Sequence, residues 1–281
     1  MSFELEDGVT HYAAVLGSPI AHSLSPVLHN AGYAAKGMSD WKYVRHESTA
    51  EQLANIVHTA PKEFRGFSVT MPAKFAALEC ADAATDRARA IGSANTLARM
   101  NDDSWRADNT DVEGIHGALD ELLGDKECQR ALVIGAGGTA RPAIYAAAQR
   151  GAENIVVVNR SDRRRELESL VDGFNVTLDF VDFKADFEQL SSTADYIIST
   201  VPAHVVEPYA KALGHSPVLD VIYDPWPTAL TTAAASNGYL TVAGHVMLAN
   251  QSYSQFEQFT GEPAPREAMR SALYKHLGFE V

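Results

Sequence analysis

Two ionisable residues, Lys74 and Asp111, lie at predicted strand–helix junctions. They are the candidates for a residue pair that transfers a proton. Lys74 opens a helix after an apolar strand that ends in Thr70, and Asp111 precedes a helical pattern over 112–123. A lysine and a carboxylate held together can give and take a proton while the charge of the site stays fixed. The sequence alone leaves open whether the two side chains meet, and a lysine at such a junction is often a solvated surface residue.

A glycine-rich turn between two apolar runs predicts a nucleotide-binding unit. The run 131–134 is typical of a buried strand, the alanine-rich segment 139–150 of a helix, and the run 154–158 of a second strand. Between the first strand and the helix, Gly135 would permit a tight turn, and Gly137 would let the backbone approach a pyrophosphate at the positive end of the helix. The expected cradle consists of Gly135, Ala136, Gly137, Gly138 and Thr139. A bare strand–turn–helix connection is the alternative that a lone glycine pattern leaves open.

The end of the second strand favours NADP(H) over NAD(H). NAD-binding units usually carry Asp or Glu there, on the ribose 2′-hydroxyl. This chain instead has Asn159 and Arg160, followed by three arginines at 163–165. Because arginine pairs with a 2′-phosphate that a carboxylate would repel, the predicted cofactor is NADP(H). At least one of the three later arginines is expected on a solvated helix face.

The net charge of −13 weighs against nucleic acids and anionic membrane surfaces as partners. An anionic substrate would need a local basic site to counter this field. Cys80 and Cys128 fit neither metal-ligand nor disulfide spacing, and no run approaches the length of a membrane-spanning helix. We therefore expect a cytoplasmic protein that binds a small molecule and contains no metal.

Alternating strand and helix patterns predict an α/β protein. In the first part of the chain, strands are expected at 11–17, 41–47 and 66–70, and helices at 26–37, 49–60 and 82–91. The segment 92–97 is expected to lead into a further strand, which pairs with 105–107 across a turn at 101–103. Ser25 before Pro26 predicts a helix N-cap. The hydroxyls of Ser23 and Ser25 at this helix N-terminus could also hold a carboxylate.

The later part of the chain predicts a mostly parallel sheet, which binds ligands at the carboxyl ends of its strands. Further strands are expected at 194–200, 217–223 and 240–242, so that Thr200, Tyr223 and Gly244 fall at such ends. Two helices, 246–260 and 264–277, complete the chain.

A series of segments, in order along nearly the whole chain, resembles the signatures of the shikimate dehydrogenase family. They are Gly17–Pro26, Val69–Lys74, Ser93–Thr96, Asp108–Asp111, Gly135–Gly138, Asn159–Ser161, Tyr223–Pro227 and Gly244–Gln251. The resemblance implies reversible NADPH-dependent reduction of 3-dehydroshikimate to shikimate in aromatic amino-acid biosynthesis. It also implies an α/β substrate domain over 1–111, a Rossmann-type NADP-binding domain over 112–245, and C-terminal helices over 246–281 that return to the first domain.

The resemblance assigns roles to the residues that match the family motifs. Lys74 and Asp111 match its catalytic pair, in which the lysine protonates the oxygen as hydride arrives. Ser23 and Ser25 match the hydroxyls that hold the substrate carboxylate. The other matches are Thr70, Asn95 and Gln251 at the ring hydroxyls, Tyr223 as a further substrate contact, Asn159, Arg160 and Arg164 at the 2′-phosphate with Ser161 beside them, and Thr200, Val221 and Gly244 along the nicotinamide half.

Four positions depart from the family pattern without removing a matched catalytic residue. Ser68 stands where the family often has Asn, Phe75-Ala76 replaces acidic residues, and His245 has no assigned role.

Residues of this chain oppose two alternative functions. An NAD-dependent quinate/shikimate dehydrogenase would carry threonine in place of Ser25 and an acid in the adenosine pocket, where this chain has Arg160. A non-catalytic NADP-binding sensor would be expected to lose Lys74 or Asp111. The sequence leaves open whether the protein is a monomer or a homodimer.

Overall fold

The computed structural model describes residues 3–279 and divides into two compact units. One unit contains the chain up to Thr110 together with the chain from Gln251 onward, and the other contains Asp111–Asn250. The first unit is therefore discontinuous in sequence. The predicted boundary at residue 245 falls at the start of helix α12 (Gly244–Thr260), whereas the second unit extends to Asn250.

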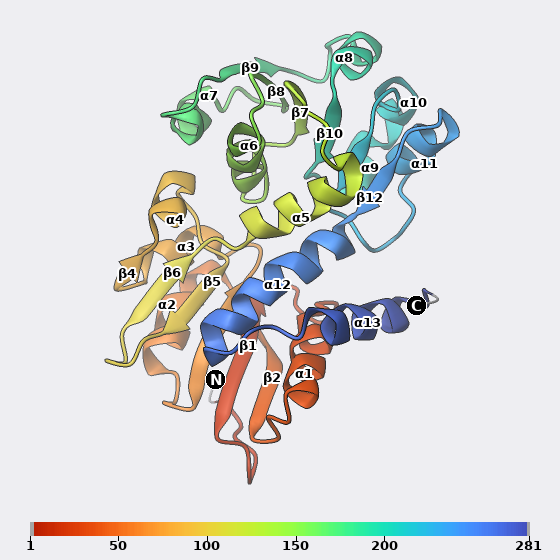
Figure 1. Ribbon diagram of the computed structural model, residues 1–281. Coiled ribbons are helices and arrows are strands. Elements are labelled where there is room, and N and C mark those ends of the chain that lie inside the picture. Colours follow the sequence, from red (N-terminus) through yellow and green to blue (C-terminus); the bar gives the residue numbers. More distant parts are fainter. Residues whose placement is uncertain (1–2, 280–281) are drawn as a thin grey trace. The chain divides into compact units, whose positions relative to one another are not determined.

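A mixed sheet forms the centre of the first unit, with strand order β2-β1-β3-β5-β6-β4 among the described residues (Figure 1). The strands are β1 (His11–Gly17), β2 (Trp41–Glu47), β3 (Phe64–Val69), β4 (Ala83–Ala84), β5 (Thr96–Arg99) and β6 (Trp105–Asp108). The first three run parallel, and β5 runs antiparallel to both β3 and β6. The helices are α1 (Ser25–Ala35), α2 (Ala50–Thr59), α3 (Lys74–Glu79), α4 (Asp86–Ile91), the later part of α12, and α13 (Arg266–Leu277), which packs on α1.

Apolar residues on the strands of this sheet pack against the helices. Phe64 and Phe67 of β3 join Trp105 of β6 and Leu53 of α2 in one buried cluster. A Cβ atom at Gly66 would lie 2.0 Å from Cδ1 of Phe259, so glycine is required where the α12 ring rests on β3. Helix α12 therefore seats directly on the strand that leads to Thr70 and Lys74.

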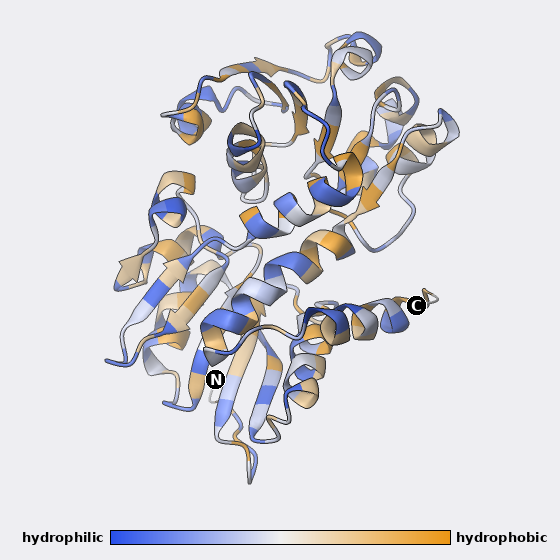
Figure 2. Ribbon diagram, viewed as in Figure 1, coloured by the Kyte–Doolittle hydropathy of each residue, from blue (hydrophilic) through white to orange (hydrophobic). Residues whose placement is uncertain are grey.

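The second unit contains a parallel sheet, with strand order β12-β11-β10-β7-β8-β9 among the described residues. Its strands are β7 (Arg130–Ile134), β8 (Asn154–Val158), β9 (Thr177–Val181), β10 (Tyr196–Ser199), β11 (Val218–Asp220) and β12 (Thr241–Ala243). Its helices are α5 (Asp111–Leu123), α6 (Ala140–Gln149), α7 (Arg164–Leu167), η1 (Glu168–Val171), α8 (Phe187–Thr193), α9 (Ala203–Val206), η2 (Glu207–Tyr209), α10 (Ala210–Leu213), α11 (Ala229–Ser236) and the start of α12. The strands are rich in hydrophobic residues (Figure 2), as expected of a sheet covered on both faces.

The order of this sheet places a topological switch between β7 and β10. The chain proceeds from β7 outward to β9 and then returns to the other side of β7. Ligands of such sheets bind at the carboxyl ends of the strands beside the switch. The glycine turn that follows β7 lies at this position.

The predicted helix over 82–91 is wrong in its first part. The chain there first forms the short strand β4, and α4 begins only at Asp86. The hydroxyl of Thr85 accepts a hydrogen bond from Ala88 N and so caps α4. Thr85 is thus a helix start signal that interrupts the apparent helical pattern.

Candidate active site

Ser23 and Ser25 lie together at the start of α1. Ser23 Oγ donates to Ser25 Oγ at 3.3 Å and accepts from Ser25 N at 3.4 Å. The prediction that Ser25 is the N-cap is wrong, because Ser25 is the first helical residue and the preceding Leu24 offers no capping side chain. Pro26 is the second helical residue, where its fixed φ suits the first turn of the helix. Ser25 is therefore inside the helix, and its hydroxyl does not cap it.

A guanidinium fixes the backbone of the serine segment. Arg45 of β2 donates from Nε and Nη2 to the carbonyl oxygen of Ser23, at 2.9 and 2.6 Å. The sequence patterns gave no sign of this contact, because Arg45 lies on a separate strand.

Thr70 and Lys74 flank the turn after β3. Thr70 N donates to Leu16 O at 2.8 Å, which ties the end of β3 to β1. Lys74 is the first residue of α3, as predicted, and its carbonyl oxygen accepts from Ala94 N at 2.9 Å. The segment just before Asn95 is therefore bonded to the residue predicted to handle the proton.

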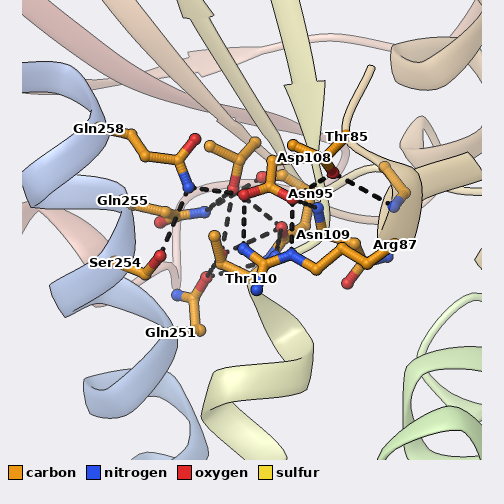
Figure 3. A network of polar contacts seen from close by, with 12 residues as sticks. Thr85, Arg87, Asn95, Asp108, Asn109, Thr110, Gln251, Ser254, Gln255 and Gln258 are labelled. Carbon is orange, nitrogen blue, oxygen red and sulfur yellow. Dashed lines mark hydrogen bonds and ion pairs between the residues drawn. The ribbon is translucent and has the colours of Figure 1, made fainter.

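Asn95 is the centre of a buried polar network drawn from three parts of the chain (Figure 3). Its Oδ1 accepts from the backbone N of Thr110 at 2.7 Å, while its Nδ2 donates to Gln251 Oε1 at 3.0 Å. Asp111 follows Thr110 directly, begins α5, and is 5% exposed. One asparagine thus joins a predicted ring-hydroxyl contact on α12 to the backbone that leads into the predicted catalytic carboxylate.

Gln255 extends this network to β2. Its Oε1 accepts from Ser68 Oγ at 2.7 Å, and Ser68 in turn accepts from Tyr43 Oη at 2.6 Å. Its Nε2 donates to Asn95 O at 3.1 Å and to Thr96 Oγ1 at 3.0 Å. Burial raises the pKa of Tyr43, so its phenol keeps its proton and donates it to Ser68. The hydrogen bonds therefore run from Tyr43 through Ser68 to Gln255.

Asp108 forms a second buried centre in the same region (Figure 3). It accepts from Arg87 Nε at 2.6 Å, from Thr85 Oγ1 at 2.6 Å and from Gln258 Nε2 at 2.7 Å. Burial alone would raise the pKa of Asp108, but the hydrogen bonds and charge of Arg87, with Thr85 and Gln258, lower it overall. The carboxylate is a structural anion that holds α4 and α12 on β6.

The nucleotide-type turn has the backbone that the sequence predicts. Gly135 has φ +113°, and a Cβ atom there would lie 2.4 Å from Thr200 Oγ1. Thr200 Oγ1 donates to Ile134 O at 2.8 Å, so the ends of β7 and β10 are joined beside the glycine. A Cβ atom at Gly137 would meet no atom within 4 Å, which leaves open space in front of this backbone for a pyrophosphate.

Val221 and Gly244, both predicted along the nicotinamide half, lie against each other. A Cβ atom at Gly244 would approach Val221 O to 1.9 Å, so only glycine fits at the start of α12. Tyr223 lies in the loop that follows β11 and is partly buried.

The segment after β8 presents the groups expected around a 2′-phosphate. Asn159 Nδ2 donates to Ser161 O at 2.9 Å and to Ser161 Oγ at 3.3 Å, which folds the segment back on itself. Arg160 is exposed, and the Arg164 guanidinium lies 5.2 Å from the centre of the Phe180 ring. Arg163 pairs with Glu166 at 2.7 Å, as expected of the arginine on a solvated face. The open Gly137 backbone and these cations fit a dinucleotide that carries a 2′-phosphate.

Sequence reasoning missed Tyr43, Arg45 and Gln255. Gln255 could have been found, because it lies one helical turn after Gln251 and so shares its helix face. Within residues 3–279, the structure has no helix long and apolar enough to cross a membrane and no group of His, Cys, Asp or Glu side chains suited to hold a metal ion.

Comparison with protein families matches three parts of the chain to models for one family. Residues 15–97 match the shikimate dehydrogenase substrate-binding domain, 118–207 the shikimate/quinate 5-dehydrogenase domain, and 244–274 the shikimate 5′-dehydrogenase C-terminal domain. The first and last matches carry most of the predicted substrate residues, and the middle match carries the glycine turn, whereas Asp111 and Tyr223 lie outside all three matches.

Individual relatives resemble the chain over almost its full length. A shikimate dehydrogenase (NADP(+)) of Methylobacterium radiotolerans is 37% identical over 266 residues, which cover 92% of this chain and 93% of that protein. The crystal structure of Mycobacterium tuberculosis shikimate dehydrogenase superposes with a TM-score of 0.88 at 46% identity, covering 94% of this chain and 99% of that one. The Thermus thermophilus shikimate 5-dehydrogenase in complex with shikimate gives a TM-score of 0.79 at 27% identity, covering 95% and 99%.

Proposed function

Because this chain belongs to the shikimate dehydrogenase family, we propose that it catalyses the reversible NADPH-dependent reduction of 3-dehydroshikimate to shikimate. The observation that carries the proposal is the hydrogen bond between Asn95 Nδ2 and Gln251 Oε1. These two residues are expected to bind ring hydroxyls, and they come from segments 156 positions apart. Their contact supports a preassembled polyol-binding surface.

Substrate binding and proton transfer are assigned in this proposal to the residues that match the family's substrate and catalytic positions. Ser23 and Ser25 hold the substrate carboxylate, while Thr70, Asn95 and Gln251 bind the ring hydroxyls, with Tyr223 as a further contact. Lys74, which together with Asp111 matches the catalytic pair of the family, delivers a proton to the carbonyl oxygen during reduction and takes it back during oxidation. Bound NADPH supplies the hydride.

The residues of the second unit hold the cofactor in this proposal. The backbone from Gly135 to Thr139 cradles the pyrophosphate at the start of α6. Arg160 and Arg164, with Asn159 and Ser161, bind the 2′-phosphate. Thr200, Val221 and Gly244 line the nicotinamide half.

We assign the substrate domain to residues 1–111, the NADP-binding domain to 112–245 and the returning helices to 246–281. We further propose that the enzyme is cytoplasmic, as suits NADPH-dependent biosynthesis, that it binds no nucleic acid, and that it acts as a monomer or homodimer. The net charge of −13 supports the absence of nucleic-acid binding. Sedimentation analysis would distinguish the two oligomeric states.

Steady-state oxidation of shikimate and of quinate, each with NADP and with NAD, tests the function. Strong preference for shikimate with NADP is the expected result, because Ser25 and Arg160 match the biosynthetic enzyme. Comparable turnover of quinate with NAD would move the protein to the quinate/shikimate dehydrogenases. Absence of turnover in every combination would favour a non-catalytic sensor.

A further inference from the structure

A positive charge lies beside the proposed carboxylate-binding serines. Arg45 is exposed on β2, an edge strand, and donates from both Nε and Nη2 to Ser23 O. Ser23 N donates to Ile20 O at 3.0 Å, so the segment is closed into a turn on one side and held by the guanidinium on the other. The same Ser23 contacts Ser25 through its hydroxyl.

A carboxylate-binding site in this protein needs a nearby positive charge, because the protein is strongly negative and the two serines are neutral. The net charge of −13 repels an anionic ligand, and hydroxyl groups carry no charge to offset that repulsion. A carboxylate bound by Ser23 and Ser25 would lie within several ångströms of the guanidinium, because Arg45 is bonded to the backbone of Ser23.

We propose that Arg45 is a positioning and charge-bearing residue of the carboxylate subsite: it fixes the Ser23 turn and attracts the carboxylate of the substrate. The inference rests on the proposed function, since it takes Ser23 and Ser25 to bind a carboxylate. The planar fork of arginine can bond the carbonyl oxygen with two N–H groups at once while its charge stays available to the ligand.

The nearest acid on the same face of β2 does not remove this charge. Glu47 lies two residues further along the strand, on the same side of the sheet. Its Oε1 accepts from Ser18 Oγ at 2.8 Å, and within residues 3–279 Glu47 forms no ion pair with Arg45.

Replacement of Arg45 by glutamine tests the proposal, because the amide retains an N–H donor but removes the charge. The expected result with shikimate at low salt is a KM raised about three- to tenfold, as for one unit charge in a partly solvated site, with kcat and the KM for NADP unchanged. High salt should shrink the difference, because screening weakens the charge in the unaltered enzyme. Arg45→Lys should retain most of the affinity.

Methyl shikimate separates the charge from a structural effect, because esterification removes the carboxylate's charge. Arg45→Gln should leave the KM for methyl shikimate unchanged. If the enzyme does not oxidise the ester, its inhibition constant as a competitor of shikimate should be unchanged instead. Equal losses for the acid and the ester would overturn the proposal, as would an unchanged KM for shikimate.

The matched control is Arg89→Gln, since Arg89 is also exposed and also donates from Nη2 to a backbone carbonyl, that of Ala84, at 2.5 Å. The KM of Arg89→Gln for shikimate should match that of the unaltered protein. A rise equal to that of Arg45→Gln would mean that the net charge of the protein alone sets the KM, and would contradict a local subsite at Arg45. Failure of the unaltered protein to oxidise shikimate would instead overturn the proposed function itself. If Arg45→Gln does not fold, Arg45→Lys and the salt dependence of the unaltered enzyme decide: a salt-independent KM for shikimate contradicts the proposal.

Discussion

The orientation of the Asn95 amide is settled by one backbone group. Thr110 N can only donate, so the side-chain atom that it meets must be Asn95 Oδ1. It follows that Nδ2 faces Gln251, whose Oε1 accepts and whose Nε2 donates to Ser252 Oγ at 3.0 Å. Two amides of the proposed substrate surface are therefore held in one orientation before any ligand binds.

Replacement of Lys74 by alanine should lower kcat about 10²–10⁴-fold, with a much smaller rise in the KM for shikimate, since proton transfer acts in the transition state. Steady-state kinetics with saturating NADP measures both constants. Lys62→Ala, at an exposed position, serves as the control and should leave both unchanged. An unaltered kcat in Lys74→Ala would reject the assigned role.

Replacement of Arg160 by alanine should raise the KM for NADPH about 10- to 100-fold and leave that for NADH almost unchanged. The expected loss corresponds to charge-assisted hydrogen bonds to a phosphate that only NADPH carries. Arg163→Ala on the same segment is the control, because Arg163 is paired with Glu166. Equal losses for both cofactors would contradict the assignment of Arg160 to the 2′-phosphate.

Close packing between whole elements depends on glycines that no side chain can replace. Gly66→Ala should lower the free energy of unfolding by about 1–3 kcal/mol, because its Cβ would meet the Phe259 ring at 2.0 Å. Chemical denaturation measures this change, and Phe259→Leu in the same chain should recover part of it by making room. Equal stability of Gly66→Ala and the unaltered protein would show that α12 does not press on β3.

Gly137→Ala is the matched comparison, since its Cβ would face open space. Its unfolding midpoint should stay unchanged while NADP binds more weakly, because the added methyl group occupies the approach of the pyrophosphate. Loss of stability without loss of NADP affinity would contradict the assignment of the Gly137 backbone to pyrophosphate binding.

The elements of this chain follow local rules, and most could be predicted for that reason. Apolar runs and turn residues predict the glycine turn after β7, most of the strands and the C-terminal helices, but not β4. Where local signals compete, prediction was wrong: Thr85 caps a helix inside the pattern at 82–91, and Ser25 lies inside α1 rather than at its cap. The partners of Ser68 and Asn95 come from distant segments, and although helical spacing marks Gln255 as sharing the face of Gln251, no local pattern encodes which residues these side chains meet.

At the scale of the whole molecule, the ionisation of Asp108 makes the folding stability of the protein depend on pH in the acidic range. Its pKa is lowered in the folded protein, so its contribution is fully present above the ordinary value of about 3.9 and is lost as pH falls through the folded value. The protein should therefore lose stability mainly below about pH 4. Circular dichroism across an acid titration measures this loss.

Asp108→Asn should be less stable at neutral pH, because the ion pair between Asp108 and Arg87 is lost, and its stability should fall less steeply below about pH 4. Asp103→Asn, at an exposed turn position with φ +65°, is the control and should follow the unaltered curve. Identical acid profiles for Asp108→Asn and the unaltered protein would contradict a role for Asp108 in acid unfolding.

The discontinuity of the first unit has a consequence for how the protein is made. Phe256 and Met269 pack on Gly32 of α1, and Phe259 packs on Gly66 of β3. All three leave the ribosome after the complete second unit, Asp111–Asn250. The second unit can therefore finish folding while one face of the earlier sheet is still bare, and the part synthesised first is the last to be completed.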